Sequence, residues 1–349
     1  MKLESRIWDA SNEDILLFRL TAADGAYIEV SNYGATWVSA VMPDAQGRYA
    51  DVLLGYDTLQ GYLLDTSYIG STVGRYANRL RNAAVEIEGI TYPLEANDGI
   101  NTNHGGVAGW HRCVWQWCEI PNGVRFMLTS PHLQGGFPGN VEAIVEYTMT
   151  DKHQVTIRHR AMTDAPTHVN MTCHAYFNLS GKAQSVDNHF LQIFSDRILD
   201  TNASFIPTGE VVEVQNTPFD FTIGHTIGEH RMLDNDQLKW NRGYNHCYLL
   251  GNPGEWHKAA YISEPSTLRC LQVETTLPAV LFYSAGYLES EMVGKCGVRH
   301  APTTGFCLET QFYPDTPAHP HFPSTLLLPG NVYDYVTRFN FDFVKLWTI

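Results

Sequence analysis

The segment VEAIVEYTMTDKHQVTIRH, residues 141–159, decides the class of fold. Polar residues 151–154 interrupt it, and on both sides of them apolar residues recur at every second position. The apolar set is Val141, Ala143, Val145, Tyr147, Met149, Val155 and Ile157. Alternation with a period of two is the pattern of a strand with one buried face. The segment therefore predicts a β-hairpin with a short loop.

Strand signals of the same kind continue along the chain. Residues 85–92 predict a tighter hairpin that turns at Glu88 and Gly89. Between 333 and 343 the aromatic residues all fall at odd-numbered positions, which would place them on one face of a strand. Helical signals are few, with one short helix expected between Thr226 and Leu238. Many strands with few crossover helices predict antiparallel sheets in a sandwich or barrel. No linker or repeat divides the sequence, so we expect one β domain over residues 1–349.

Charge and composition exclude several classes of function. The net charge of −14 argues against nucleic acid or an anionic membrane as partner. The N-terminal residues lack the apolar run of a signal peptide, and no run approaches the roughly 18 apolar residues of a membrane span. Seven scattered cysteines without a C-x-x-C pair indicate reduced thiols in a cytoplasmic protein, and a structural zinc site is not expected.

The stretch MTCHAYFNL, residues 171–179, suggests where the chemistry lies. It also alternates, but its polar face carries His174, Tyr176 and Asn178, and it has no formal charge. An ordinary solvent-facing strand carries Lys, Glu and Thr. The pattern is compatible with an unusual sheet surface and with the wall of a polar site that uses His174.

Three further segments carry candidate functional groups. GRYANRLRN, residues 74–82, holds three arginines that suit polar oxygens or a carboxylate, or that balance nearby acids in a solvated loop. In NTNHGG, residues 101–106, two glycines let the chain turn sharply after His104, which either lines a cleft or bonds its own backbone. In GFCLETQFYP, residues 305–314, Glu309 lies among apolar neighbours. It is therefore either a base with a raised pKa or an exposed carboxylate on an edge strand.

The ordered set of these segments resembles the aldose 1-epimerase (galactose mutarotase) family. The matching pieces span nearly the whole chain: NYGAT (32–36), GRYANR (74–79), NHGG (103–106), GFPGN (136–140), HAYFNL (174–179) and GFCLE (305–309). The resemblance implies a large antiparallel β-sandwich with a polar cleft. It also implies interconversion of the α and β anomers of a free hexose, such as galactose or glucose, without cofactor or metal.

The resemblance assigns roles to individual residues. It implies that Glu309 is the base and His174 the acid, and that a cation near Glu309 keeps that carboxylate ionised. That cation would be Arg79, which the resemblance also makes a sugar ligand. The residues implied to bind the sugar are Arg79, His104, Asn78, Tyr176 and Asn245. The partner expected is a small sugar, and the chain is expected to be a monomer or a homodimer.

Four positions depart from the family pattern. Asn245 stands where the family commonly has Asp, Leu281 where many members have Gln, and Gly286 where Asn is common. Cys173 replaces an Asn, but strand parity places it on the apolar face, away from His174. Because the acid and base are kept, we expect the reaction to be retained, with either a preferred sugar other than galactose or a weaker affinity.

Two other interpretations stay open at this point. The chain could epimerise a modified or phosphorylated sugar, which predicts additional Arg or Lys near the cleft. It could instead be a non-catalytic sugar-binding protein on the same fold. Loss of Glu309 or His174 would favour binding alone, and both residues are present.

Overall fold

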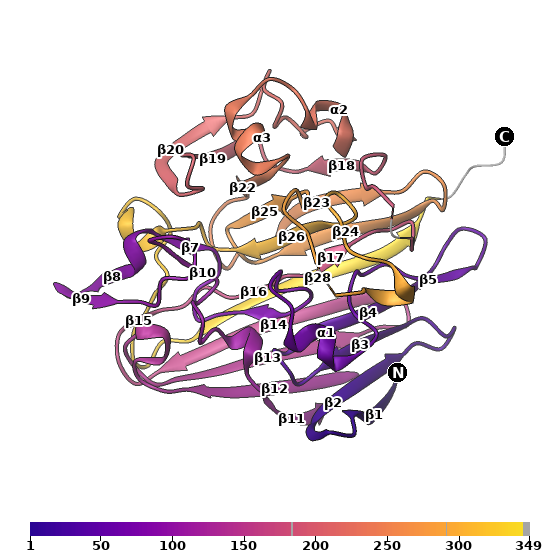
Figure 1. The fold of residues 1–349 in the computed structure, drawn as a ribbon, viewed down its shortest axis with the longest axis horizontal. Helices are drawn as coiled ribbons and strands as arrows, with labels where there is room; N and C mark the ends of the chain where they lie inside the picture. Colours follow the sequence, from indigo (N-terminus) through magenta and orange to yellow (C-terminus); the bar gives the residue numbers. More distant parts are fainter. Residues whose placement is uncertain (183, 291, 345–349) are drawn as a thin grey trace.

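Strands dominate the computed structural model, which describes residues 1–182, 184–290 and 292–344. Three large sheets and four two-stranded ladders are built from antiparallel pairs (Figure 1). The α-helices of the described ranges are short: α1 (Leu59–Leu63), α2 (Ile227–Arg231) and α3 (Asp236–Asn241). None of them is long and apolar enough to cross a membrane. The prediction of an all-β antiparallel fold is confirmed.

The largest sheet has nine strands, in the spatial order β11 (Gln116–Ile120), β12 (Gly123–Ser130), β13 (Val141–Met149), β14 (Gln154–Thr163), β28 (Tyr333–Phe343), β24 (Arg269–Thr275), β23 (His257–Ser263), β18 (Phe190–Ile193) and β21 (His225–Thr226). A five-stranded sheet is formed by β1 (Lys2–Asp9), β2 (Asn12–Thr21), β3 (Tyr27–Ser31), β4 (Thr36–Pro43) and β5 (Tyr49–Asp51).

The six-stranded sheet follows the order β17 (Tyr176–Phe177), β26 (Phe306–Gln311), β25 (Ala279–Tyr283), β22 (Asn245–Leu249), β19 (Arg197–Thr201) and β20 (Pro207–Glu213). The two-stranded ladders are β6 (Thr72–Val73) with β16 (Thr172–Cys173), β7 (Arg79–Leu80) with β10 (Thr102–Asn103), β8 (Ala84–Ile87) with β9 (Ile90–Pro93), and β15 (Thr167–His168) with β27 (Leu326–Leu327). Short 3₁₀ turns connect several of these strands.

The hairpins expected from the alternating patterns are present. β13 pairs with β14 in register from Val141 opposite Thr163 to Met149 opposite Val155. β8 pairs with β9 around the predicted turn. In β13 the residues of the apolar set are buried, which is the face that the alternation predicted.

Two predicted elements differ from the structure. The alternating stretch 169–179 is not one strand but two short ones: β16 pairs with β6, and β17 pairs with β26. The single helix expected near Thr226 is a pair, α2 and α3. Asn235 starts the second helix, because its side chain accepts hydrogen bonds from the backbone N–H groups of Gln237 and Leu238.

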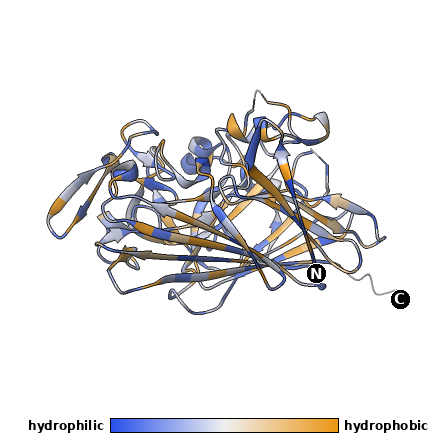
Figure 2. Ribbon diagram, turned by 90° about the horizontal axis from the view of Figure 1, so that it is seen from below, coloured by the Kyte–Doolittle hydropathy of each residue, from blue (hydrophilic) through white to orange (hydrophobic). Residues whose placement is uncertain are grey.

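The core lies where the three large sheets meet, around Trp37 of β4. Its ring centroid is 5.2 Å from that of Phe339 on β28, 5.8 Å from Phe177 on β17 and 6.4 Å from Tyr147 on β13. Trp37 has no exposed surface. Figure 2 shows the hydrophobic residues along the strands of the interior, with hydrophilic residues frequent in the loops.

We expect Trp37→Ala to lower the free energy of unfolding by about 3–5 kcal/mol, because the cavity opens where three sheets pack together. Urea unfolding followed by circular dichroism measures the loss. Trp256→Ala is the matched control, since that ring is 47% exposed, and it should cost less than about 1 kcal/mol. Equal losses in the two variants would contradict this account of the core.

Candidate functional site

A cleft of about 390 Å³ lies on the face of the six-stranded sheet opposite the core. Its lining includes all seven candidate residues from the sequence. The full lining is Thr66, Ser67, Tyr68, Asn78, Arg79, Asp98, Asn103, His104, His174, Tyr176, Phe205, Asn245, Tyr283, Tyr287 and Glu309. A larger hollow of about 670 Å³ elsewhere contains none of the seven, and its charged groups include the ion pair of Asp51 with Lys295.

Strand β26 carries Glu309 into the cleft. Phe306 and Leu308 of this strand pack into the core, so the alternate residues Cys307 and Glu309 face the other way. Glu309 is only 2% exposed. Its Oε2 has no hydrogen-bond partner among the described residues, which leaves this oxygen available to a substrate.

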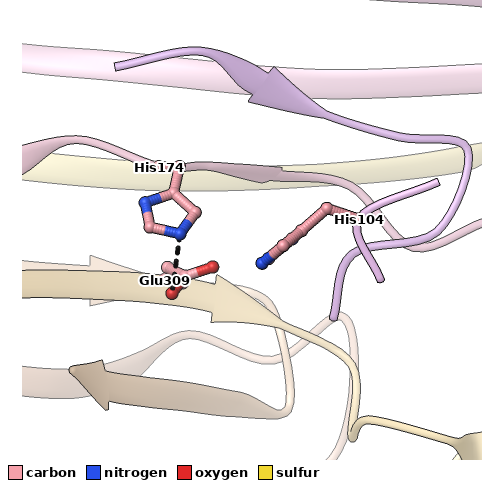
Figure 3. A group of neighbouring side chains, drawn as sticks. All are labelled: His104, His174 and Glu309. Atoms are coloured by element: carbon pink, nitrogen blue, oxygen red, sulfur yellow. Dashed lines mark ion pairs between the residues drawn. The ribbon is translucent and has the colours of Figure 1, made fainter. Parts of the chain in front are cut away.

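His174 faces Glu309 from the connection between β16 and β17 (Figure 3). Nε2 of His174 lies 3.6 Å from Oε1 of Glu309. Its ring is stacked between Tyr176, at 5.1 Å between centroids, and Tyr68, at 6.0 Å. The backbone is also held, because His174 donates to the carbonyl of Ser71. A separation of 3.6 Å is longer than a direct hydrogen bond, so both groups can still bond a substrate.

His104 approaches Glu309 from a different part of the chain (Figure 3). Both His104 and Asn78 have positive φ, of 51° and 68°, and two hydrogen bonds connect them. The His104 N–H donates to the Asn78 carbonyl, and the Asn78 N–H donates to Nδ1 of His104. Nδ1 is therefore an acceptor, which places the ring proton on Nε2. Burial lowers the pKa of His104 well below its usual value, so this ring is a neutral donor.

Arg79 borders the cleft at its charged end. Its Nε donates to Oδ2 of Asp98 at 2.7 Å, and its guanidinium lies 4.8 Å from the centroid of the Phe205 ring. Paired in this way, Arg79 keeps a fixed direction while other N–H groups of its fork stay available to oxygens of a ligand.

The other two arginines of segment 74–82 have structural roles. Arg75 is buried and donates to the carbonyls of the glycine-rich loop 137–139. Arg81 forms an ion pair with Asp315. Of these three arginines Arg79 alone lines the cleft, and its part in ligand recognition stays a prediction.

Burial shifts the proton affinities of the acid–base pair in opposite directions. Loss of water disfavours the charged form of each group, which lowers the pKa of His174 to about 4 and raises the pKa of Glu309 to about 8. The charge of Arg79 lowers the pKa of Glu309, but by less than burial raises it, so the expectation that Arg79 keeps this carboxylate ionised near neutral pH is not met. Between these two values the pair binds one proton.

The same three side chains resemble the donor set of a zinc site, because ligand atoms of His104, His174 and Glu309 lie within 4.8 Å of one another. A coordinating nitrogen must be free of its proton. Nε2 of His104 carries one, since Nδ1 accepts from the Asn78 backbone. If that proton moved to Nδ1, the Nδ1–H of His104 would point at the backbone N–H of Asn78, and neither group could accept a hydrogen bond from the other. Nε2 of His104 therefore keeps its proton, and the three side chains do not fit a metal.

The departures from the family pattern lie in different surroundings. Asn245 lines the cleft. Leu281 is paired across the sheet with Glu309 and borders a small recess of about 10 Å³ beside it. Gly286 packs against backbone carbonyls, where a Cβ would lie 2.5 Å from the nearest oxygen. Cys173 is buried in the core, as the parity of the strand predicted.

Several cleft residues were not selected from the sequence, namely Tyr68, Asp98, Phe205, Tyr283 and Tyr287. Tyr68, Phe205 and Tyr287 belong to loops, where no periodicity indicates the direction of a side chain. In the sequence, Asp98 is marked only as a turn residue, because it precedes Gly99. A further residue, Cys307, shares the cleft face with Glu309 by strand parity, and that signal was present in the sequence.

Comparison with known proteins gives consistent matches over most of the chain. The family model described as aldose 1-epimerase matches residues 17–340. Galactose mutarotase from Bos taurus is 37% identical over 321 residues, 92% of each chain, and that from Homo sapiens is 37% identical over 90% of this chain and 91% of the relative. The GalM/aldose epimerase homologue from C. elegans superposes with a TM-score of 0.87 at 28% identity, covering 94% of this chain and 99% of that structure.

Proposed function

Because the chain belongs to the aldose 1-epimerase family, we propose that Glu309 and His174 are the base and the acid that interconvert the α and β anomers of a free hexose. The observation that supports these roles is the approach of a buried carboxyl and a buried imidazole to 3.6 Å in a cleft with mostly uncharged polar walls. The protein is an isomerase of the mutarotase type.

The reaction needs one proton removed and one delivered. Glu309 takes the proton of the anomeric hydroxyl, the C1–O5 bond breaks as the C1 carbonyl forms, and Nε2 of His174 gives its proton to O5. Rotation about C1–C2 then presents the other face of the carbonyl. Ring closure reverses both transfers and produces the other anomer with no net change in protons. Each such group typically contributes about 10²–10⁴-fold.

Proton counting shows when the pair can act. The reactive form is a carboxylate with an imidazolium, and it holds one proton, as does the neutral pair. The cleft therefore contains the right number of protons between pH of about 4 and about 8. Below this range Glu309 is protonated while His174 is charged, so the base is lost. Above it the pair loses its proton, so the acid is lost.

The remaining candidates are proposed as ligands of the sugar hydroxyls. His104 offers a neutral N–H, Arg79 a charged fork, and Asn78 and Asn245 amide groups, with Tyr176 beside the acid. The relatives named galactose mutarotase support galactose as the sugar to test first, with glucose tested beside it. The apolar Leu281 beside Glu309 supports a different preference among the hydroxyl positions.

A phosphorylated sugar is less well supported. Arg79 is the only Lys or Arg among the described residues that line the cleft, and it is already paired with Asp98. The net charge of −14 adds no attraction for a dianion. A purely binding protein has no need for a buried acid and base so close together, and the activity tests below distinguish it.

We expect Glu309→Gln to reduce the acceleration of mutarotation at least about 10²-fold, because the amide cannot accept the anomeric proton. Polarimetry or NMR of fresh α-D-glucose and α-D-galactose measures the rate above that of the buffer. Glu119→Gln is the control, since this carboxylate is exposed on β11. A Glu309→Gln variant as fast as wild type would remove Glu309 as the base, and a wild type no faster than buffer on a panel of aldoses would favour the binding protein.

The pH dependence follows from the proton count. We expect kcat/KM to be level between pH of about 5 and 7 and to fall about tenfold per unit above pH 8, where the pair loses its single proton. Initial rates across this range, corrected for the buffer at every pH, measure the profile. A kcat/KM that keeps rising from pH 7 to 10 would show that the imidazolium is not needed.

We expect Asn245→Asp to change KM or the preference between sugars while leaving the acid–base step in place. A carboxylate makes charge-assisted hydrogen bonds that are roughly twice as strong as those of an amide. The measurement compares kcat and KM for glucose and galactose in both proteins. Identical constants for every sugar would place Asn245 outside the binding site.

A further inference from the structure

We propose that Cys307 is a positioning residue whose sulfur accepts a hydrogen bond from Nδ1–H of His174, so that Nε2 is the nitrogen that gains and loses the catalytic proton. The proposal rests on the acid role given to His174 above. The observation behind it is a distance of 3.6 Å between Sγ of Cys307 and Nδ1 of His174, within the range of a hydrogen bond to sulfur.

The fold places this sulfur next to the Nδ1 edge of the His174 ring. Cys307 lies two residues before Glu309 on β26, so both side chains point to the same face. Tyr176, whose ring stacks on His174, is the cross-strand partner of Cys307. Tyr68 also stacks on the ring, which presents Nδ1 to Cys307 and Nε2 to Glu309.

The chemistry of the cycle requires the proton on Nδ1 to stay. After Nε2 delivers its proton to O5, the neutral ring must keep Nδ1–H, because Nε2 needs its lone pair for the return step. An acceptor at Nδ1 favours this tautomer over the one with the proton on Nε2. Sγ of Cys307, 3.6 Å from Nδ1, lies at the right distance to be that acceptor.

A thiol differs in one important way from the carboxylate that often holds a catalytic histidine. Burial raises the pKa of Cys307 well above its usual value, so the group is a neutral thiol throughout the working range. A carboxylate would stabilise the imidazolium and weaken it as an acid. A neutral sulfur orients the ring without that effect, which is consistent with the low pKa of His174.

The experiment compares Cys307→Ala with Cys307→Ser. Alanine removes the acceptor, and we expect kcat to fall about 3- to 10-fold with KM changed less than twofold, the size of one neutral hydrogen bond. Serine retains an acceptor oxygen and should restore kcat to within about twofold of wild type. Cys270→Ser, a cysteine on β24 outside the cleft, controls for the chemical change itself.

A structural readout separates positioning from general damage. Nitrogen-15 NMR of the labelled histidine rings should show that neutral His174 of the wild type carries its proton on Nδ1. In Cys307→Ala a larger fraction of neutral His174 should carry the proton on Nε2. If Cys307→Ala does not fold, the spectra of the wild type and of Cys307→Ser decide. A wild-type His174 protonated at Nε2, or a Cys307→Ala variant with unchanged kcat and unchanged spectrum, would overturn the proposal.

The same data distinguish the two proposals from each other. A wild-type protein that accelerates no aldose contradicts the proposed function, whatever the NMR spectrum shows. An active wild type with the proton of neutral His174 on Nε2 contradicts the role of Cys307 alone.

Discussion

The alternation of side chains along β26 is the constraint on which the rest of the site depends. Phe306 and Leu308 are held in the core, and this fixes Cys307 and Glu309 on the cleft side. A slip of one residue would exchange the two sets and place the carboxylate in the hydrophobic core. Phe306 packs on Phe177, which in turn packs on Trp37. The aromatic packing of the core therefore also helps to position Glu309.

Burial then gives the pair its chemistry. The carboxyl and the imidazole are each removed from water, and each is shifted towards its neutral form. In the cleft wall, Tyr68, Asn78 and His104 all adopt positive φ. Such conformations cost on the order of 1–3 kcal/mol each and persist where the surrounding structure holds them.

Local patterns predicted much of this molecule, and the errors have physical causes. The hairpin of β13 and β14 follows from alternation alone, since neighbouring residues of a strand must face opposite sides. The stretch 169–179 looked the same but is split, because its two halves pair with strands of different sheets. Residue pattern alone could not separate the arginines at 75 and 81 from Arg79, which only the family resemblance singled out, since the groups that bind them come from distant segments.

The sequence by itself determined the fold class, the buried face of the hairpin strands β13 and β14 and, through resemblance, the identity of the candidate acid and base. These depend on residue type and spacing, which are local. Tertiary structure decided the 3.6 Å approach of His174 to Glu309, the proton affinities of the pair and the contact of Cys307 with Nδ1. Those depend on how much water is excluded and on which distant segments meet, and both are settled only when the sheets pack together.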